Sequence, residues 1–359
     1  MKTPASFEEI EAMQKVDLHL HLDGAISKEI LIAMASKHGI PLNEEQLSHY
    51  PNPGPFDAHA DWAEFQRFLD CFGLSLAIMQ MPETIYDTTM EVIRDLKAQN
   101  VAYAELKIAP NYHTKGGHSM EEMIASTLKA LKDAEAETGV LTKLVIAIPR
   151  EISYEGPFKG DLSGNGITAE DIVAVARQFQ HEGVVAIDLA CAEQDDPEPY
   201  VGLFQSTLNT DLMRTVHAGE AGIRRATNVE IAVLQMGANR IGHGLPLGTD
   251  PKLDELLERI IKEEIGIARC PLSNVAMSTT DGELDGLGRL FDGGALVSVS
   301  SDDPGIFGPT NSIARNLHHV AERLGLGVNG IQELTRLAIE SSFASEGERQ
   351  ALLEKCGLV

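Results

Sequence analysis

The stretch Val184-Val-Ala-Ile-Asp-Leu-Ala190 is apolar at every position except Asp188. An apolar run without strict alternation is typical of a parallel strand that is buried on both faces. Seven further β-favouring runs can be marked along the chain. The complete set of expected strands is 15–22, 101–109, 141–149, 184–191, 212–218, 240–244, 266–271 and 296–301.

Helical patterns fill the intervals between these runs, so strand and helix alternate over the whole chain. The expected helices are 27–38, 82–100, 119–138, 168–180, 227–236, 251–264, 311–324, 331–344 and 345–355. Alternation of this kind implies a parallel sheet, and eight units favour a closed barrel over an open doubly wound sheet. We therefore expect an α/β fold, a (β/α)8 TIM barrel, with residues 1–359 forming a single domain.

The segment 42–76 interrupts this alternation and is predicted to be a helical insertion after the first strand. It contains the turn-rich stretch Pro51-Asn-Pro-Gly-Pro55, followed by a helical pattern over 61–76. An aromatic and apolar stripe at helical spacing indicates core packing. The stripe consists of Trp62, Phe65, Phe68, Leu69 and Phe72. Because barrel active sites open on this side, the segment is also a candidate lid or pocket wall.

Composition excludes several classes of function. The net charge of −25, from 29 basic and 54 acidic residues, disfavours nucleic acids and anionic membranes as partners. We find no apolar run of membrane-spanning length and no signal-peptide core at the N-terminus. The four cysteines form no CxxC pair, which excludes a zinc knuckle and indicates free thiols. A cytoplasmic protein is expected, and its oligomeric state is left open.

Polar side chains gather where the expected strands end. His19 and His21 are two positions apart on the first strand, so they point to the same face. Four more such residues stand at or just after the ends of later strands, namely His217, His243, Asp302 and Asp303, and Glu220 comes three positions after His217. The carboxyl ends of barrel strands meet at one mouth, where catalytic groups lie. Taken singly, each residue also has an ordinary structural explanation, such as a rim histidine or a helix cap.

Taken together, these residues predict a metal site. Buried histidines and acids at one mouth would repel or stay unpaired unless a cation organised them. Three imidazoles and one carboxylate suit zinc, with iron, cobalt and manganese as weaker candidates; they are supplied by His19, His21, His217 and Asp302. The predicted chemistry is hydrolytic attack on an sp² carbon. Glu220 is assigned proton transfer, His243 the orientation or deprotonation of water, and Asp303 a contact to substrate or water.

These motifs, in this order, resemble those of the adenosine deaminase family of the amidohydrolase superfamily, from about Val16 to the final helices. The matching strings are His19-Leu-His-Leu-Asp-Gly24, Tyr103-Ala-Glu-Leu106, His217-Ala-Gly-Glu220, Ile241-Gly-His-Gly244, Cys270-Pro-Leu-Ser-Asn274 and Ser301-Asp-Asp-Pro304. The resemblance implies a hydrolase that acts on the C–N bonds of cyclic amidines. It would hold one zinc ion per chain and convert adenosine or deoxyadenosine to inosine or deoxyinosine plus ammonia.

The resemblance also implies individual roles. Zinc ligands are implied at His19, His21, His217 and Asp302. Glu220 would protonate the purine ring nitrogen next to the attacked carbon, and His243 would position the zinc hydroxide. Asp303 would contact the imidazole-ring nitrogen of the purine, and Asp23 the ribose hydroxyls. His21 and Cys191 also count among the substrate-contacting residues. Relatives that act on the free base tend to carry Glu at the position of Asp23.

Two positions depart from the family pattern. Lys107 stands where Arg is usual, and Leu189-Ala-Cys191 stands where the family usually has Leu-Ala-Gly. The family's glycine offers a backbone N–H to the purine. The side chain of Cys191 would crowd the base or force a change in φ, unless a small backbone shift accommodates it.

Other substrates therefore stay open, including adenine, an adenosine nucleotide and a modified adenosine such as an aminated futalosine. No Lys/Arg cluster near the motifs marks a phosphate pocket, which weighs against a nucleotide. A metal-binding barrel that acts as a non-catalytic binding module is the alternative from another class. The presence of Glu220 and His243 favours an enzyme.

Overall fold

In the computed structural model of the protein, the described residues are 3–52, 54–56, 62–150, 166–191, 193–194, 196–222, 224–277 and 284–359. The side chains of Trp62, Phe65, Gln66 and Asp285 are not described. The predicted aromatic stripe can therefore be followed only at Phe68, Leu69 and Phe72.

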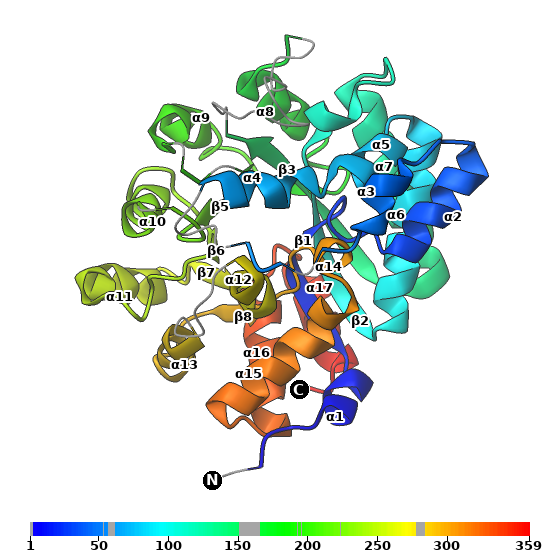
Figure 1. Ribbon diagram of the computed structural model, residues 1–359. Coiled ribbons are helices and arrows are strands. Elements are labelled where there is room, and N and C mark those ends of the chain that lie inside the picture. The colour runs from blue at the N-terminus through cyan, green and yellow to red at the C-terminus, as the bar shows by residue number, and fades with distance from the viewer. Residues whose placement is uncertain are drawn as a thin grey trace.

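Eight parallel strands pair in sequence order around a barrel (Figure 1). Their bounds are β1 Lys15–His21, β2 Val101–Ile108, β3 Leu141–Pro149, β4 Val184–Ala190, β5 Met213–Ala218, β6 Arg240–His243, β7 Gly266–Arg269 and β8 Val297–Val299. Backbone bonds close the ring, because His21 N donates to Asp302 O at 3.1 Å and Asp302 N donates to His19 O at 2.9 Å. The predicted (β/α)8 barrel is confirmed, and each predicted strand is found within one or two residues of its expected ends.

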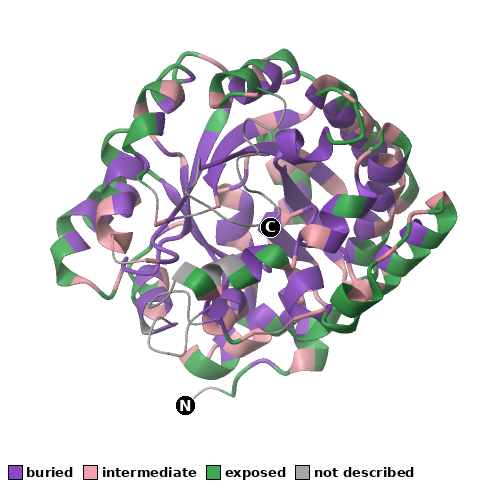
Figure 2. Ribbon diagram, turned by 45° about the horizontal axis from the view of Figure 1, so that its top comes forward, coloured by how far each residue is buried: buried purple, intermediate pink, exposed green. Residues whose placement is uncertain are grey.

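The strands form the buried centre of the molecule. All eight residues of β2 are buried, and in β4 all but one are. Figure 2 shows the strands almost entirely buried, whereas the exposed residues lie on the outer faces of the surrounding helices. Continuous burial explains why these runs are apolar without alternation. It also means that a polar residue inside a strand, such as Asp188, needs a partner within the barrel.

Helices cover the barrel on its outer side (Figure 1). Their bounds are α1 Phe7–Ala12, α2 Lys28–His38, α3 Glu44–Ser48, α4 Trp62–Asp70, α5 Gly73–Ile78, α6 Pro82–Ala98, α7 Met120–Thr138, α8 Ala169–Gln178, α9 Val201–Gln205, α10 Arg225–Leu234, α11 Asp254–Lys262, α12 Pro271–Met277, α13 Leu284–Asp292, α14 Pro304–Phe307, α15 Ile313–Leu324, α16 Val328–Glu340 and α17 Glu346–Lys355. None of the described helices is long and apolar enough to cross a membrane.

Side-chain caps explain several predicted helix starts. Ser27, Ser119, Thr168 and Ser345 each accept a hydrogen bond from a backbone N–H in the first turn of the helix that follows. Helices α12 and α13, between β7 and β8, were not predicted, because the first is short and the second contains two glycines. The single-domain organisation stays a prediction.

Helices α3, α4 and α5 lie in or next to the segment 42–76. Figure 1 places α4 across the mouth of the barrel. The Phe68 ring on α4 stacks on Phe307 with centroids 5.3 Å apart and meets Phe72 edge-on at 5.4 Å. Phe68, Leu69 and Phe72 are buried, as expected for core residues, and they also line the cavity described below. The action of this segment as a lid stays a prediction.

Candidate metal centre and active-site cavity

A cavity opens at the carboxyl ends of the barrel strands. Its empty volume is about 580 Å³, including the part open to solvent, which is within the usual range for small-ligand sites. Ala109, Ala147 and Ala190 line it from consecutive strand ends. Three larger apolar side chains come from Phe68 and Leu69 on α4 and from Phe72 just after that helix. The remaining lining residues are imidazoles, carboxyl groups, a tyrosine and a cysteine. Among the described residues, no lysine or arginine lines this cavity.

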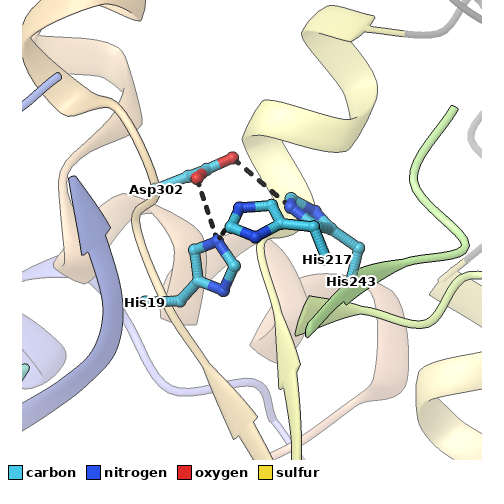
Figure 3. Close-up of side chains that lie close together, drawn as sticks. All are labelled: His19, His217, His243 and Asp302. Atoms are coloured by element: carbon cyan, nitrogen blue, oxygen red, sulfur yellow. Dashed lines mark hydrogen bonds and ion pairs between the residues drawn. The ribbon is translucent and has the colours of Figure 1, made fainter. Parts of the chain in front are cut away.

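The four predicted metal ligands converge at the inner end of the cavity. Nε2 of His217 lies 2.9 Å from Nε2 of His19 and 3.1 Å from Nε2 of His21. Oδ1 of Asp302 lies 3.3 Å from His19 Nε2 and 3.6 Å from His21 Nε2. Figure 3 shows His19 and His217 facing Asp302, with His243 beside them. Residues from β1, β5 and the turn after β8 thus meet, as the sequence predicted.

This arrangement fits a divalent metal ion. Burial lowers the pKa of His19 well below its usual value and the pKa of His21 to about 3, so both rings are neutral. Neutral imidazole nitrogens about 3 Å apart share a proton in one tautomer, and in the other they can direct their lone pairs at one cation. Zinc bonds of about 2.0–2.1 Å place tetrahedral ligand atoms roughly 3.3 Å apart, which matches these separations. Two overlapping groups could each hold a cation, because their ligand atoms lie within 4.8 Å of one another. They are His19, His217, His243 and Asp302, and His21, Asp302 and Asp303.

Asp188 orients His217 from behind. Its Oδ2 lies 2.9 Å from His217 Nδ1 and accepts a hydrogen bond from Lys107 Nζ at 2.8 Å. Burial alone would raise the pKa of Asp188, but His217 and Lys107 outweigh it and lower that pKa well below its usual value. A carboxylate at Nδ1 leaves the Nε2 lone pair directed at the cluster, the usual arrangement behind a metal-ligating histidine.

The string Cys270-Pro-Leu-Ser-Asn274 supports two other site residues from α12. Ser273 Oγ donates to Asp302 Oδ2 at 2.7 Å, so only Oδ1 faces His19 and His21. Asn274 Nδ2 donates to His243 Nδ1 at 3.0 Å, which places the single proton of the neutral His243 ring on Nε2. Burial lowers the pKa of His243 to about 3, consistent with a neutral ring. Nε2 is buried and has no hydrogen-bond partner among the described residues.

Glu220 lies beside His243 rather than among the four converging atoms. Its Oε2 is 3.7 Å from His243 Nε2, and its side chain is buried in the cavity wall. Burial, Asp302 and Glu193 raise the pKa of Glu220 well above its usual value. The raised pKa favours the protonated form of Glu220, which is the form that can donate a proton.

Glu193 fixes the loop that carries Glu220. Its carboxylate accepts backbone hydrogen bonds from Gly219, from Glu220 at 2.5 Å and from Ala221 at 2.7 Å. Asn228 Nδ2 donates to the same carboxylate at 3.1 Å. Glu193 is buried, so these donors have no access to bulk water as a replacement. The carboxylate therefore determines where the Glu220 side chain enters the cavity.

Replacing Glu193 by Gln should destabilise this loop. A glutamine side chain has one acceptor oxygen and presents an NH₂ group where the second oxygen accepted N–H bonds. At least one buried backbone donor would lose its partner, which lowers the free energy of unfolding by about 1–3 kcal/mol. Urea denaturation of the variant measures this loss. Glu182→Gln, at an exposed position, is the matched control; equal stability of the two variants would contradict the anchoring role of Glu193.

Asp303 and Asp23 complete the acidic wall of the cavity. Oδ1 of Asp303 is buried without a hydrogen-bond partner within the described part of the chain. Burial, together with Asp302 and Asp23, raises the pKa of Asp303 well above its usual value. Burial also raises the pKa of Asp23 to about 6, and its Oδ1 accepts a hydrogen bond from Gly24 N at 3.1 Å. Both carboxyl groups are available to a ligand.

Comparison with known proteins identifies the relatives of this chain. The family model described as adenosine deaminase matches residues 14–357. The chain belongs to the adenosine deaminase family. It is therefore an enzyme, a hydrolase that acts on C–N bonds, and its reaction is the hydrolytic deamination of an aminopurine.

Individual relatives of the family align over almost their whole length. An adenosine deaminase from Clostridium acetobutylicum is 28% identical over 97% of this chain and 98% of its own. An adenine deaminase from Rhodospirillum rubrum is 30% identical over 95% of both chains. The solved structure of an adenine deaminase from Arthrobacter aurescens is 28% identical, with a TM-score of 0.78 over 96% of this chain and 98% of its own. Relatives with different names are thus about equally similar.

The two residues that depart from the family pattern lie in different parts of the site, one behind the metal cluster and one in the cavity wall. Lys107 is buried behind the metal cluster, where it pairs with Asp188. Cys191 lines the cavity and has a φ of 65°, in the left-handed region that glycine adopts more readily. His243 and Asp302 share this feature, with φ of 62° and 64°. Such backbone conformations cost about 1–2 kcal/mol each and are concentrated at functional sites.

Sequence reasoning missed several supporting residues of the site. Asp188, Asn274 and Arg150 received no role, although each contacts a predicted site residue directly. Asp188 carried a usable signal, because it is the only charged residue in an otherwise apolar strand. Asn274 lay inside a quoted family string, but its contact with His243 depends on how two loops pack.

Proposed function

We propose that the protein is a zinc-dependent deaminase of a 6-aminopurine nucleoside. Adenosine or deoxyadenosine is the substrate, and inosine or deoxyinosine plus ammonia are the products. The observation that carries the proposal is the convergence of three imidazoles and Asp302 beside the buried carboxyl group of Glu220. A binding module would need the cluster but not a proton donor next to it.

His19, His21, His217 and Asp302 are the residues that would hold the metal ion. Three nitrogens and one oxygen suit zinc, and a bound divalent ion would supply an activated nucleophile at neutral pH. Nε2 of His243 is close enough to the cluster to be a ligand by distance alone. We assign it to water instead, because Asn274 donates to its Nδ1 and thereby leaves the ring proton on Nε2.

His243 and Glu220 act in water orientation and proton transfer. His243 donates from Nε2 toward the space beside Asp302 and orients the attacking water there. Glu220 holds a proton and delivers it to the purine ring nitrogen next to the attacked carbon, which lets that carbon accept the nucleophile. The two side chains are 3.7 Å apart, so they act on neighbouring atoms of one substrate.

The rest of the cavity fits a flat base with a polar substituent. The alanines at the strand ends leave room for a ring, and Phe68 on α4 and Phe72 just after that helix offer apolar surface beside it. Asp303 is positioned to bond the imidazole-ring nitrogen of the purine through its unpartnered Oδ1, and Asp23 to accept bonds from sugar hydroxyls. His21 and Cys191 contribute further contacts. We assign Asp303 a share in catalysis because it fixes the base against the metal cluster.

The acidic wall disfavours a substrate with a phosphate group. Asp23, Asp303 and Glu220 face the cavity, and no described lysine or arginine does. A phosphate would meet carboxyl groups without a compensating cation, which is costly in a buried site. Adenine is the second candidate substrate, because the relative from Rhodospirillum rubrum is named adenine deaminase.

Release of ammonia from a panel of purines tests this proposal. Zinc-loaded protein is mixed with adenosine, deoxyadenosine, adenine and AMP, and ammonia is measured. We expect turnover of the nucleosides and a kcat/KM for AMP at least about 100-fold lower, a difference of roughly 3 kcal/mol. Turnover of adenine alone would show that the substrate is the free base and not the nucleoside. Absence of ammonia from every compound would refute the proposed reaction.

A further inference from the structure

The strand order of the barrel fixes the sequence of residues around the cavity mouth. Asp303 follows β8, Asp23 follows β1, Tyr112 follows β2, Cys191 follows β4 and Glu220 follows β5. All five line the same cavity. Cys191 and Tyr112 therefore occupy the arc of the wall that runs from Glu220 to Asp23 on the side away from Asp303.

The Cys191 side chain is held in this arc. Its thiol and the Tyr112 side chain are hydrogen-bond partners, and its backbone has the left-handed φ of 65°. Arg150 locks that conformation, because its Nη1 donates to Cys191 O at 3.1 Å and its backbone N donates to Ala190 O at 3.0 Å. Nη2 of the same buried guanidinium donates to His217 O at 2.6 Å. The turn cannot relax and withdraw the thiol without breaking these bonds.

Two buried atoms in the same site indicate that a ligand completes it. Asp303 Oδ1 and His243 Nε2 have no hydrogen-bond partner among the residues that the structure describes. Both belong to the region where the proposed substrate binds. A purine in the cavity would satisfy Asp303 from one side, and its opposite edge would then face Cys191.

The orientation of the base follows from the proposed function, on which this inference rests. With the attacked carbon at the metal cluster, one ring nitrogen meets Glu220, the imidazole-ring nitrogen meets Asp303 and the sugar points to Asp23. The edge that remains carries C2 and N3 and faces the arc between Glu220 and Asp23. We propose that Cys191, together with Tyr112, is a specificity-determining residue that admits 6-aminopurines with hydrogen at C2 and rejects those with a substituent there.

A comparison of adenosine with 2,6-diaminopurine ribonucleoside tests this inference. The two differ only by the amino group at C2, and both release ammonia from C6. We expect the wild-type protein to favour adenosine by about 10- to 100-fold in kcat/KM, as for one misfitting group in a tight pocket. Cys191→Gly should bring this ratio close to one. Cys191→Ala, which keeps Cβ but lacks sulfur, should give an intermediate ratio, and Cys356→Ala, at the end of α17, should leave it unchanged.

The possible failures are distinguishable. If the wild type turns over adenosine but accepts the 2-amino compound equally well, or if Cys191→Gly keeps the wild-type ratio, the role of Cys191 is wrong and the proposed function stands. If neither nucleoside is turned over, the proposed function fails, and calorimetric binding of inosine and guanosine decides the inference. The inference is supported if the wild type binds inosine more tightly than guanosine and Cys191→Gly binds the two equally. It is overturned if the wild type binds inosine and guanosine equally. Circular dichroism and metal analysis establish that the variants are folded and loaded.

Discussion

Replacing Glu220 by Gln is expected to lower kcat by about 10²- to 10⁴-fold while zinc stays bound, the usual cost of losing a general acid. Glutamine has nearly the same shape as the protonated Glu220 and keeps a hydrogen-bond donor, but it has no proton to transfer. Since Glu220 is not among the four converging ligand atoms, its replacement should leave the metal stoichiometry at one per chain.

Steady-state kinetics and metal analysis of the same preparation measure both quantities. Glu230→Gln is the matched control, because Glu230 is an exposed residue of α10, just beyond the loop that carries Glu220. The control should retain wild-type kcat. A Glu220→Gln protein that loses zinc along with turnover would show that Glu220 holds the metal, and one that retains turnover would remove its role as proton donor.

Replacing His217 by Ala should abolish zinc binding and, with it, turnover. Nε2 of His217 is the atom closest to both other histidines, and Asp188 fixes its direction from behind. In the wild type, zinc at 100 times its dissociation constant should stabilise the fold by about 2.7 kcal/mol, because it binds the folded state only. This stabilisation should be absent from the variant.

Thermal unfolding with and without zinc, together with metal analysis, tests this expectation. The wild-type melting temperature should fall after treatment with a chelator and recover when zinc is added back. His181→Ala removes an exposed imidazole and should behave as the wild type does. If His217→Ala still carries one zinc ion per chain, the four-residue metal site is wrong.

The barrel could be predicted from sequence because its strands are buried on both faces. Runs such as 184–190 therefore contain a signal that does not depend on tertiary contacts. The convergence of His19, His217 and Asp302 was equally accessible, because strand ends in a closed parallel barrel share one mouth. Helices α12 and α13 were missed, since local pattern is weak in short or glycine-containing segments.

The contacts that support the metal cluster from behind could not be predicted from sequence, because they depend on tertiary packing. Lys107 and Asp188 are 81 positions apart, and their pairing depends on which faces of β2 and β4 point inward. The hydrogen bond from Asn274 to His243 depends on the packing of α12, which itself was not predicted. The left-handed φ of Cys191 was not predicted as such, because the sequence indicated only that the side chain would crowd the base or force a change in φ, unless a small backbone shift accommodated it.

Arg150 couples the shape of the substrate pocket to the position of a metal-binding histidine. One guanidinium holds the carbonyl of Cys191 and the carbonyl of His217. A substitution at position 150 would therefore disturb pocket shape and metal retention at once, whereas a change at position 191 alters only the former. Divergence toward new substrates in this lineage should consequently proceed through substitutions at position 191. Arg150 should be retained, because both metal binding and the shape of the pocket depend on it.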